Sequence, residues 1–238
     1  MITMKTKSLT LTALVIILSY AGCSDNGRIR ERPKEIVETG PRAEIFQKIM
    51  ESFPEKQNIT ESQQDLFASG TGKQVVLTKE SPVYVTFISE GASLPNTFGW
   101  YSYSKDAKPS AAASLELHVL FPHVSDRVLK QGDRLRLGEG SFPAGTVIGF
   151  FLLINGWENG EVNFGRQTFY TDIEFNPEGL QQHVLFKQDD LGDIVLTFED
   201  QLTSQVSDKD YNDIIFTVTD NADNAEVTSF DLTNIIHL

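Results

Sequence analysis

From residue 73 onward, the chain consists of short apolar runs that are separated by turn-forming residues. The runs are rich in β-branched and aromatic residues, and several alternate apolar and polar positions, as a half-buried strand does. In the run at 193–199, Ile194, Leu196 and Phe198 share one face. Clusters of Gly, Pro, Asn and Asp separate the runs. Strands are predicted at 75–78, 83–89, 98–104, 114–121, 146–155, 182–187, 193–199 and 213–220.

These strands constrain the fold class. No segment between them keeps a helical period over about 10–15 residues, which argues against parallel βαβ units. Roughly eight to ten short strands in such a segment are typical of two packed antiparallel sheets. We therefore expect an all-β fold, an antiparallel β-sandwich of jelly-roll type, over residues 73–238.

A short helix is predicted ahead of the strands. Apolar residues follow one another at helical spacing through 43–53, and Pro54 ends the pattern. They are Ile45, Phe46, Ile49, Met50 and Phe53. The polar face mixes acids and bases, whereas helices that lie on membranes favour a basic face. We expect a helix or extended lead-in segment at 44–72 that lies on the domain.

The first 22 residues predict an export signal. A pair of lysines precedes an apolar run at 9–18 that is too short to span a bilayer, which needs about 20 residues. The segment SYAGC at 19–23 resembles the lipobox of bacterial lipoproteins, with Tyr20 where leucine is usual. The resemblance implies lipidation of Cys23, which would hold the protein in the membrane. The alternative is an ordinary signal, cleaved or uncleaved, at whose end Cys23 merely falls.

Two expectations follow from the lipoprotein hypothesis. Ser24 follows the cysteine, which by the convention for enteric lipoproteins implies the outer membrane of a bacterial cell envelope. Residues 23–43 are charged and are interrupted by Pro33 and Pro41, so they predict a flexible tether.

Composition excludes several functions. The chain has 33 Asp and Glu against 20 Lys and Arg, a net charge of −13, which argues against a nucleic-acid partner. A single cysteine excludes an intrachain disulfide and any multi-cysteine metal site. The four histidines have no metal-binding spacing, no G-x-S-x-G motif occurs, and the G-x-G at 138–140 opens no predicted helix.

Acidic residues are concentrated at 189–213. Eight acids lie there, with Lys209 as the sole base: Asp189, Asp190, Asp193, Glu199, Asp200, Asp208, Asp210 and Asp213. If the strands at 193–199 and 213–220 are neighbours, the acids that end one meet those that begin the other. Carboxylates about 4 Å apart repel by ~4 kcal/mol per pair at an effective dielectric constant of 20. The cluster needs a cation, protonation or full solvation, and all-oxygen ligands favour Ca²⁺ over Mg²⁺.

The loop DKDYND at 208–213 has the D-x-D-x-N spacing of many calcium loops. It is not an EF-hand, because Asp213 stands where an EF-hand has glycine and Thr219 where it has glutamate. The alternative interpretation is an acidic surface loop that only keeps the protein soluble.

Three segments resemble the bacterial domain of unknown function 4114, which also occurs in LruC-type surface proteins. They are VYVTFISEGASLPNTFGWYSY at 83–103, GTVIGFFLLINGW at 145–157 and FEDQLTSQVSDKDYNDIIFTV at 198–218. The resemblance covers about residues 75–220. It implies a β-rich extracellular protein, often calcium-dependent, with no established catalytic activity. The implied ion ligands are Glu199, Asp200, Asp208, Asp210 and Asp213, with Asn212 as a further candidate.

Other residues are weaker candidates for ligand contact. Glu90 and Asn96 flank a predicted turn, where they complete an ion shell or a polar rim, or simply cap the turn. Trp157 is predicted in a loop, where it could stack on a sugar. The remaining aromatic candidates, which core packing equally explains, are Trp100, Tyr101, Tyr103 and Tyr170.

Together these features predict a non-catalytic, calcium-binding β-sandwich lipoprotein. Its expected partners are the membrane, through Cys23, and a glycan or an envelope or matrix protein bound in adhesion or surface assembly. The alternatives are a carbohydrate-active hydrolase that uses Glu199 or Asp200, and a purely structural envelope component.

Overall fold

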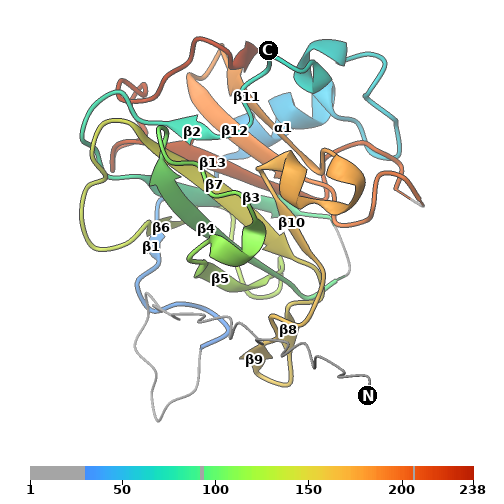
Figure 1. Cartoon of the computed structure of the whole chain (residues 1–238). Coiled ribbons are helices and arrows are strands. Elements are labelled where there is room, and N and C mark those ends of the chain that lie inside the picture. The colour runs from blue at the N-terminus through green and yellow to red at the C-terminus, as the bar shows by residue number, and fades with distance from the viewer. Residues whose placement is uncertain (1–29, 92–93, 206) are drawn as a thin grey trace, which may run out of the picture.

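A computed structural model describes residues 30–91, 94–205 and 207–238 (Figure 1). The predicted signal peptide, Cys23 and the start of the predicted tether lie outside these residues. None of the helices within them has the length and apolar character needed to cross a membrane.

Two antiparallel sheets make up most of the described chain. The larger sheet has the order β1 (Val37–Glu38), β6 (Asp133–Arg136), β3 (Tyr84–Glu90), β13 (Ile214–Thr219), β12 (Asp193–Phe198), β11 (His183–Gln188) and β14 (Ile236–His237). The smaller sheet has the order β10 (Thr168–Tyr170), β7 (Thr146–Leu153), β4 (Asn96–Ser104) and β5 (His118–Val124), and β2 (Val75–Val76) also pairs with β7. Only the short β14 runs parallel to its neighbour, β11, among the strand pairs of the described residues.

The two sheets pack face to face, as Figure 1 shows for β4 and β7 in front of β3 and β13. The ring of Phe98 on β4 stacks on that of Phe216 on β13, with centroids 4.0 Å apart. Both side chains are buried in a core that draws on both sheets. The expected all-β sandwich is therefore confirmed, while the jelly-roll topology stays a prediction.

The predicted helix is present as α1 (Ala43–Ser52). It covers the outer face of the larger sheet, where Ile45, Ile49 and Phe53 are buried. The ring of Phe53 stacks on that of Phe186 in β11 at 5.1 Å. Four short 3-10 helices complete the described elements: η1 (Gln64–Phe67), η2 (Ala112–Ser114), η3 (Ile173–Phe175) and η4 (Pro177–Gly179).

The described part of the predicted tether contacts the domain at several points. Residues 30–42 lie along the larger sheet, where β1 pairs with β6. The guanidinium of Arg32 forms an ion pair with Asp133, which is fully buried. The Thr39 hydroxyl donates to the backbone carbonyl of Gly132. The charged, proline-containing sequence predicted that this segment is solvated. The charge of Arg32 instead pairs with a buried carboxylate far along the chain, that of Asp133.

The segment around Trp157 also differs from the expected loop. Residues 157–162 form a hairpin of β8 (Trp157–Glu158) and β9 (Glu161–Val162). Asn159 and Gly160 have φ values of 55° and 82° at its turn, a conformation that asparagine and glycine tolerate best. An Asn-Gly pair between short strands is the signal that identifies such a hairpin.

Candidate metal centre

The acidic cluster lies where the hairpin of β12 and β13 opens into a loop. Phe198 pairs with Ile214 in the antiparallel register, so the residues that follow β12 lie beside those that precede β13. The backbone N–H of Asp200 donates to Oδ2 of Asp213 at 2.8 Å. The predicted convergence of the two ends of the loop is thus present in the structure.

Three carboxylates form the centre of the cluster. Glu199, Asp208 and Asp210 each offer an oxygen, and these oxygens all lie within 4.8 Å of one another. Calcium–oxygen distances are about 2.3–2.6 Å, so oxygens on opposite sides of one ion lie about 4.8 Å apart. One calcium ion can therefore contact all three groups. Glu199 and Asp210 are buried, while Asp208 is exposed.

The backbone of the loop fixes these side chains. Lys209 and Tyr211 have φ values of 61° and 56°, which turn the chain sharply on either side of Asp210. The backbone N–H of Tyr211 and the hydroxyl of Ser207 both donate to the Glu199 carboxylate. Lys56 donates its backbone N–H to Asp210 at 2.7 Å, so the segment after α1 also holds the loop.

Tyr211 anchors the loop through its side chain. The side chain is buried, and its hydroxyl donates to the backbone carbonyl of Gln181 at 3.0 Å. Its ring lies 5.0 Å from the ring of Phe67 in η1. The loop is therefore attached to the apolar layer beneath α1 rather than projecting freely.

The cluster is electrostatically unfavourable as it stands. Burial raises the pKa of Glu199 to about 7, and repulsion from Asp210 and Asp208 adds to the shift. Burial, with repulsion from Asp200, raises the pKa of Asp213 to about 8. Burial also raises the pKa of Asp200 and of Asp210. None of these carboxylates forms an ion pair with a Lys or Arg that the structure describes.

Two asparagines, Asn212 and Asn96, hold the acidic cluster in place. The Asn212 amide donates to the carbonyl of Phe53 at 2.9 Å, which ties the loop to the end of α1. Asn96 is fully buried, and its amide donates to Asp200 and accepts from the backbone N–H of Asn155. The expectation that Asn96 contacts a ligand is therefore corrected, because protein groups occupy both ends of its amide.

Two adjoining hollows lie beside the cluster and share Leu94. The first, of about 440 Å³, is lined by Glu90, His123 and Arg127, among others. Burial raises the pKa of Glu90 there to about 7. Trp157 does not line this hollow, but its ring stacks on that of His123, which does, with centroids 6.1 Å apart.

The second hollow, of about 500 Å³, reaches the acidic cluster at Asp200. Its lining includes three glutamines, Gln167, Gln201 and Gln205, together with Leu202 and the acid Glu178. Sequence reasoning missed these residues, because isolated glutamines in predicted loops have no pattern that distinguishes them from solvated ones.

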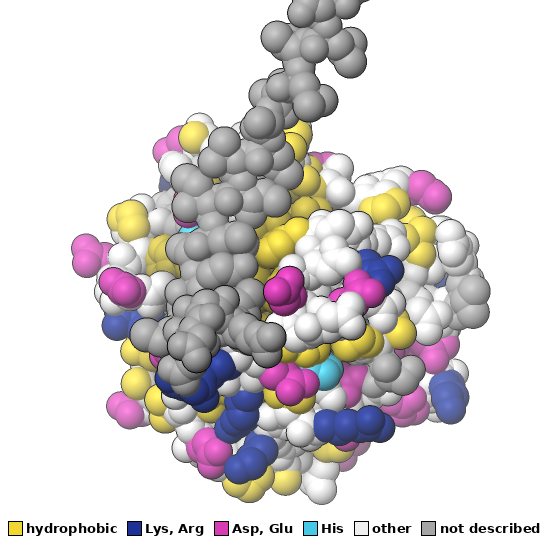
Figure 2. Space-filling view, turned by 90° about the horizontal axis from the view of Figure 1, so that it is seen from below, with side chains coloured by type: hydrophobic (Ala, Val, Ile, Leu, Met, Phe, Trp, Pro, Cys, Tyr) yellow, Lys and Arg dark blue, Asp and Glu magenta, His cyan; other side chains and the backbone are white. Residues whose placement is uncertain are grey.

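Three of the four other aromatic candidates belong to the protein interior. Trp100, Tyr101 and Tyr170 are buried, as core packing requires, while Tyr103 is half-buried. On the face seen in Figure 2, acidic, basic and apolar side chains are interspersed, so the excess negative charge is not gathered there.

Comparison with known protein families finds a match for one segment of the chain. Residues 142–221 match the family model described as a domain of unknown function, DUF4114. The match confirms the predicted resemblance from β7 to the end of β13 and includes the whole acidic loop, but it does not extend over the earlier strands. No curated protein and no solved structure matches the chain.

Proposed function

We propose that this chain is a calcium-stabilised, non-catalytic β-sandwich module that is anchored at the bacterial cell envelope and binds a ligand beside its acidic loop. The convergence of Glu199, Asp208 and Asp210 within 4.8 Å supports the ion site most directly. The lipid anchor on Cys23 and the outer-membrane location are part of the proposal and rest on the sequence at 19–24.

Calcium suits this donor set better than other ions. The ligands are carboxylate oxygens, which hard cations prefer over the thiolate and imidazole ligands of zinc or copper. Magnesium needs near-ideal octahedral geometry at about 2.0–2.1 Å, whereas calcium accepts irregular oxygen shells. A divalent cation would also offset the repulsion between the buried Glu199 and Asp210.

Calcium would affect ligand binding indirectly, by holding the acidic loop in one conformation. Asp200 belongs to the cluster and also lines the second hollow, so a loop held by calcium gives this hollow a fixed wall. Side-chain amides beside an aliphatic surface suit the hydroxyls and C–H faces of a neutral sugar. A glycan is therefore the proposed ligand, in adhesion or surface assembly, with an envelope or matrix protein as the other outcome of a binding test.

The position of the carboxylates favours a non-catalytic role. A glycosidase needs two carboxyl groups on opposite sides of a bound sugar, about 5–9.5 Å apart. Glu199 is only 1% exposed, and the Asp200 carboxylate accepts a hydrogen bond from the buried Asn96. Glu199 is therefore closed to a substrate, and of the two acids only Asp200 lines the second hollow.

Thermal melting of the calcium-stripped protein tests the ion site. We expect the melting temperature to rise with calcium, to rise less with magnesium, and to return to its starting value with a chelator. Asp210→Asn should lose most of the response. Asp220→Asn is the matched control, because Asp220 is a buried aspartate that accepts backbone N–H groups at the opposite end of β13. Equal melting of the wild-type protein in calcium and in chelator would refute the ion site.

A glycan array tests the ligand separately. We expect binding of neutral oligosaccharides that weakens in Gln201→Ala. Turnover of an oligosaccharide that disappears in Glu199→Gln, with calcium binding retained, would instead establish the hydrolase.

A further inference from the structure

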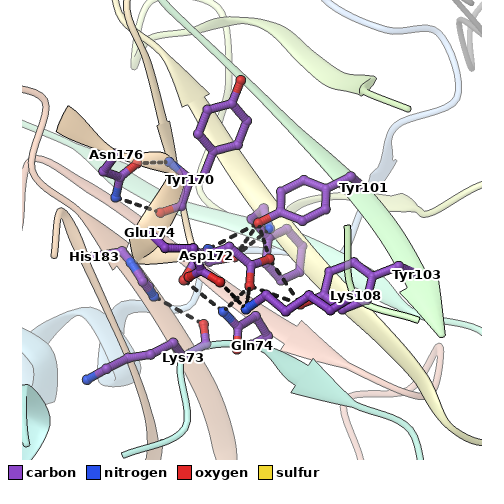
Figure 3. Close-up of polar contacts among 12 residues, drawn as sticks. Lys73, Gln74, Tyr101, Tyr103, Lys108, Tyr170, Asp172, Glu174, Asn176 and His183 are labelled. Atoms are coloured by element: carbon purple, nitrogen blue, oxygen red, sulfur yellow. Dashed lines mark hydrogen bonds and ion pairs between the residues drawn. The ribbon is translucent and has the colours of Figure 1, made fainter. Parts of the chain in front are cut away.

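A second polar network lies on the outer face of the smaller sheet. Asp172 follows β10 and is fully buried. Its carboxylate accepts hydrogen bonds from the hydroxyls of Tyr101, at 2.8 Å, and Tyr103, at 2.9 Å, and from the amide of Gln74, at 3.0 Å (Figure 3). These donors come from β4 and from the segment before β2, so they fix the carboxyl group firmly.

Lys108 brings an amine to this carboxyl group. Its Nζ lies 2.5 Å from Oδ1 of Asp172 and 2.6 Å from Oε1 of Glu174. Figure 3 shows the lysine side chain reaching between the two acids. A lysine, a fully buried aspartate and a second acid thus meet at one nitrogen atom.

The distances satisfy the requirement for a bond between Nζ and the carboxyl carbon. A C–O bond is about 1.2 Å long, so Nζ lies less than about 3.8 Å from Cγ of Asp172. Groups held about 3–3.5 Å apart in a suitable orientation react as near-attack pairs, with large effective molarities. Any close ion pair meets this distance. This pair differs because Asp172 is fully buried and its carboxylate is held by three further donors.

We propose that Lys108 and Asp172 form an intramolecular isopeptide bond. Nζ of Lys108 attacks Cγ of Asp172, a C–N bond forms, and one Cγ–O bond breaks. The ammonium and carboxylate together become an amide and one water molecule. Both hydrogens of that water come from Nζ, and the remaining N–H stays on the amide. No oxidant or other reactant is needed.

Glu174 carries the protons in this step. Burial lowers the pKa of Lys108, but its hydrogen bonds to Asp172 and Glu174 outweigh burial and raise the pKa overall. The ammonium must therefore lose a proton before it can attack, and the Glu174 carboxylate is in contact with it. Glu174 passes this proton to Oδ1 of Asp172, so that the amine attacks a neutral carboxyl group. After the attack, Glu174 moves a second proton from Nζ to the same oxygen, which leaves as water, and Glu174 ends the step unchanged.

The two tyrosines stabilise the charge that develops during the attack. Oδ2 of Asp172 accepts from both hydroxyls, at 2.8 Å from Tyr101 and 3.1 Å from Tyr103. Attack on Cγ places negative charge on this oxygen, and preorganised donors of this kind lower the barrier for acyl transfer. The same hydroxyls are placed to donate to the amide oxygen of the product.

The bond would join a connection within the smaller sheet to the connection that leads from it to the larger sheet. Lys108 lies in the segment between β4 and β5, and Asp172 lies between β10 and β11. β10 has only three residues, and it pairs with β7 at one edge of this sheet. A covalent link at its end would hold this edge strand in place.

Intact-mass spectrometry of the denatured full chain tests the proposal, with Lys108→Arg as the key variant. Arginine keeps the positive charge beside both acids but does not form the amide. The substitution alone adds about 28 Da, and loss of the cross-link restores about 18 Da of water, so we expect a difference of about 46 Da. This difference is independent of how the N-terminus is processed, and peptide mapping should recover a branched peptide that contains both residues.

Two further variants make the test specific. Lys105→Arg is the matched control in the same segment, and it should differ from the wild-type mass by about 28 Da only. Glu174→Gln changes a half-exposed side chain and should leave the protein folded, as circular dichroism can verify, while most molecules remain uncross-linked. A difference of only about 28 Da for Lys108→Arg in folded protein would overturn the proposal. Complete cross-linking in Glu174→Gln would overturn the role of Glu174.

Discussion

The backbone N–H of Asp200 donates a hydrogen bond to the carboxylate of Asp213, at 2.8 Å. This contact brings the two ends of the loop between β12 and β13 together. It also places two largely buried carboxylates side by side, and burial raises the pKa of each. The stability of the metal-free protein should therefore depend on pH.

The sign of that dependence follows from the raised pKa values. Asp213 titrates near 8 in the folded chain against 3.8 for an unperturbed aspartate, and Glu199 near 7 against 4.5. Between about pH 4 and 8, the folded state binds more protons than the unfolded state, so stability falls as pH rises through this window. Melting in chelator at pH 5.5, 6.5, 7.5 and 8.5 should show a steady decline of several degrees, which added calcium removes. A melting temperature that rises over this pH range in chelator would contradict the predicted fall in stability.

Asp208→Asn should separate ion binding from folding. Asp208 is exposed, so its replacement should change the metal-free stability by less than about 0.5 kcal/mol. Removal of one of three charged ligands should weaken calcium binding by about tenfold or more, which corresponds to about 1.4 kcal/mol. Isothermal titration calorimetry measures the affinity, and Asp106→Asn is an exposed aspartate control outside the cluster. Unchanged affinity in Asp208→Asn would remove this residue from the ligand set.

Arg32→Ala should show that the segment before α1 is part of the folded domain. The substitution leaves the fully buried Asp133 without its ion-pair partner, so we expect a loss of about 2–3 kcal/mol. Lys130→Ala breaks an exposed pair with Glu38 and should leave the stability almost unchanged. Urea denaturation compares the two variants. Equal, small losses would mean that the segment packs only loosely on β6.

Phe98→Ala should test the contact between the two sheets. The ring is fully buried and stacks on Phe216 of the other sheet, so its loss should cost about 3–5 kcal/mol. Val37→Ala, at a position that is 62% exposed, should change stability by less than about 0.5 kcal/mol. Chemical denaturation with both variants measures the difference, and a small loss in Phe98→Ala would show that the sheets pack less closely than described.

The strands of the sandwich could be predicted where the sequence carries a local pattern. β12 is an example, because its apolar residues alternate with polar ones. β6 has the sequence DRLR and was missed, although Asp133 and Arg134 are both buried. Their charges are balanced by groups far along the chain, such as Arg32 and the loop carbonyl of Ala222, which no local pattern reveals.

At the candidate sites, too, contacts within one hairpin could be predicted from the sequence, whereas contacts between distant segments could not. The meeting of Glu199 and Asp200 with Asp213 could be predicted, because one hairpin brings them together. Asn96 reaches Asp200 from the other sheet, and that contact depends on how the two sheets are stacked. The environment of Asp172 depends on the same packing, since its donors lie some 70 to 100 residues away in sequence.

The outermost strands of the larger sheet, β1 and β14, have two residues each. Long exposed edges offer unpaired backbone groups to neighbouring chains and so promote aggregation, whereas very short edge strands do not. Neighbouring molecules therefore have little opportunity to extend this sheet into a continuous fibril. The smaller sheet differs, because β5 at its edge has seven residues, so pairing between copies would have to start there.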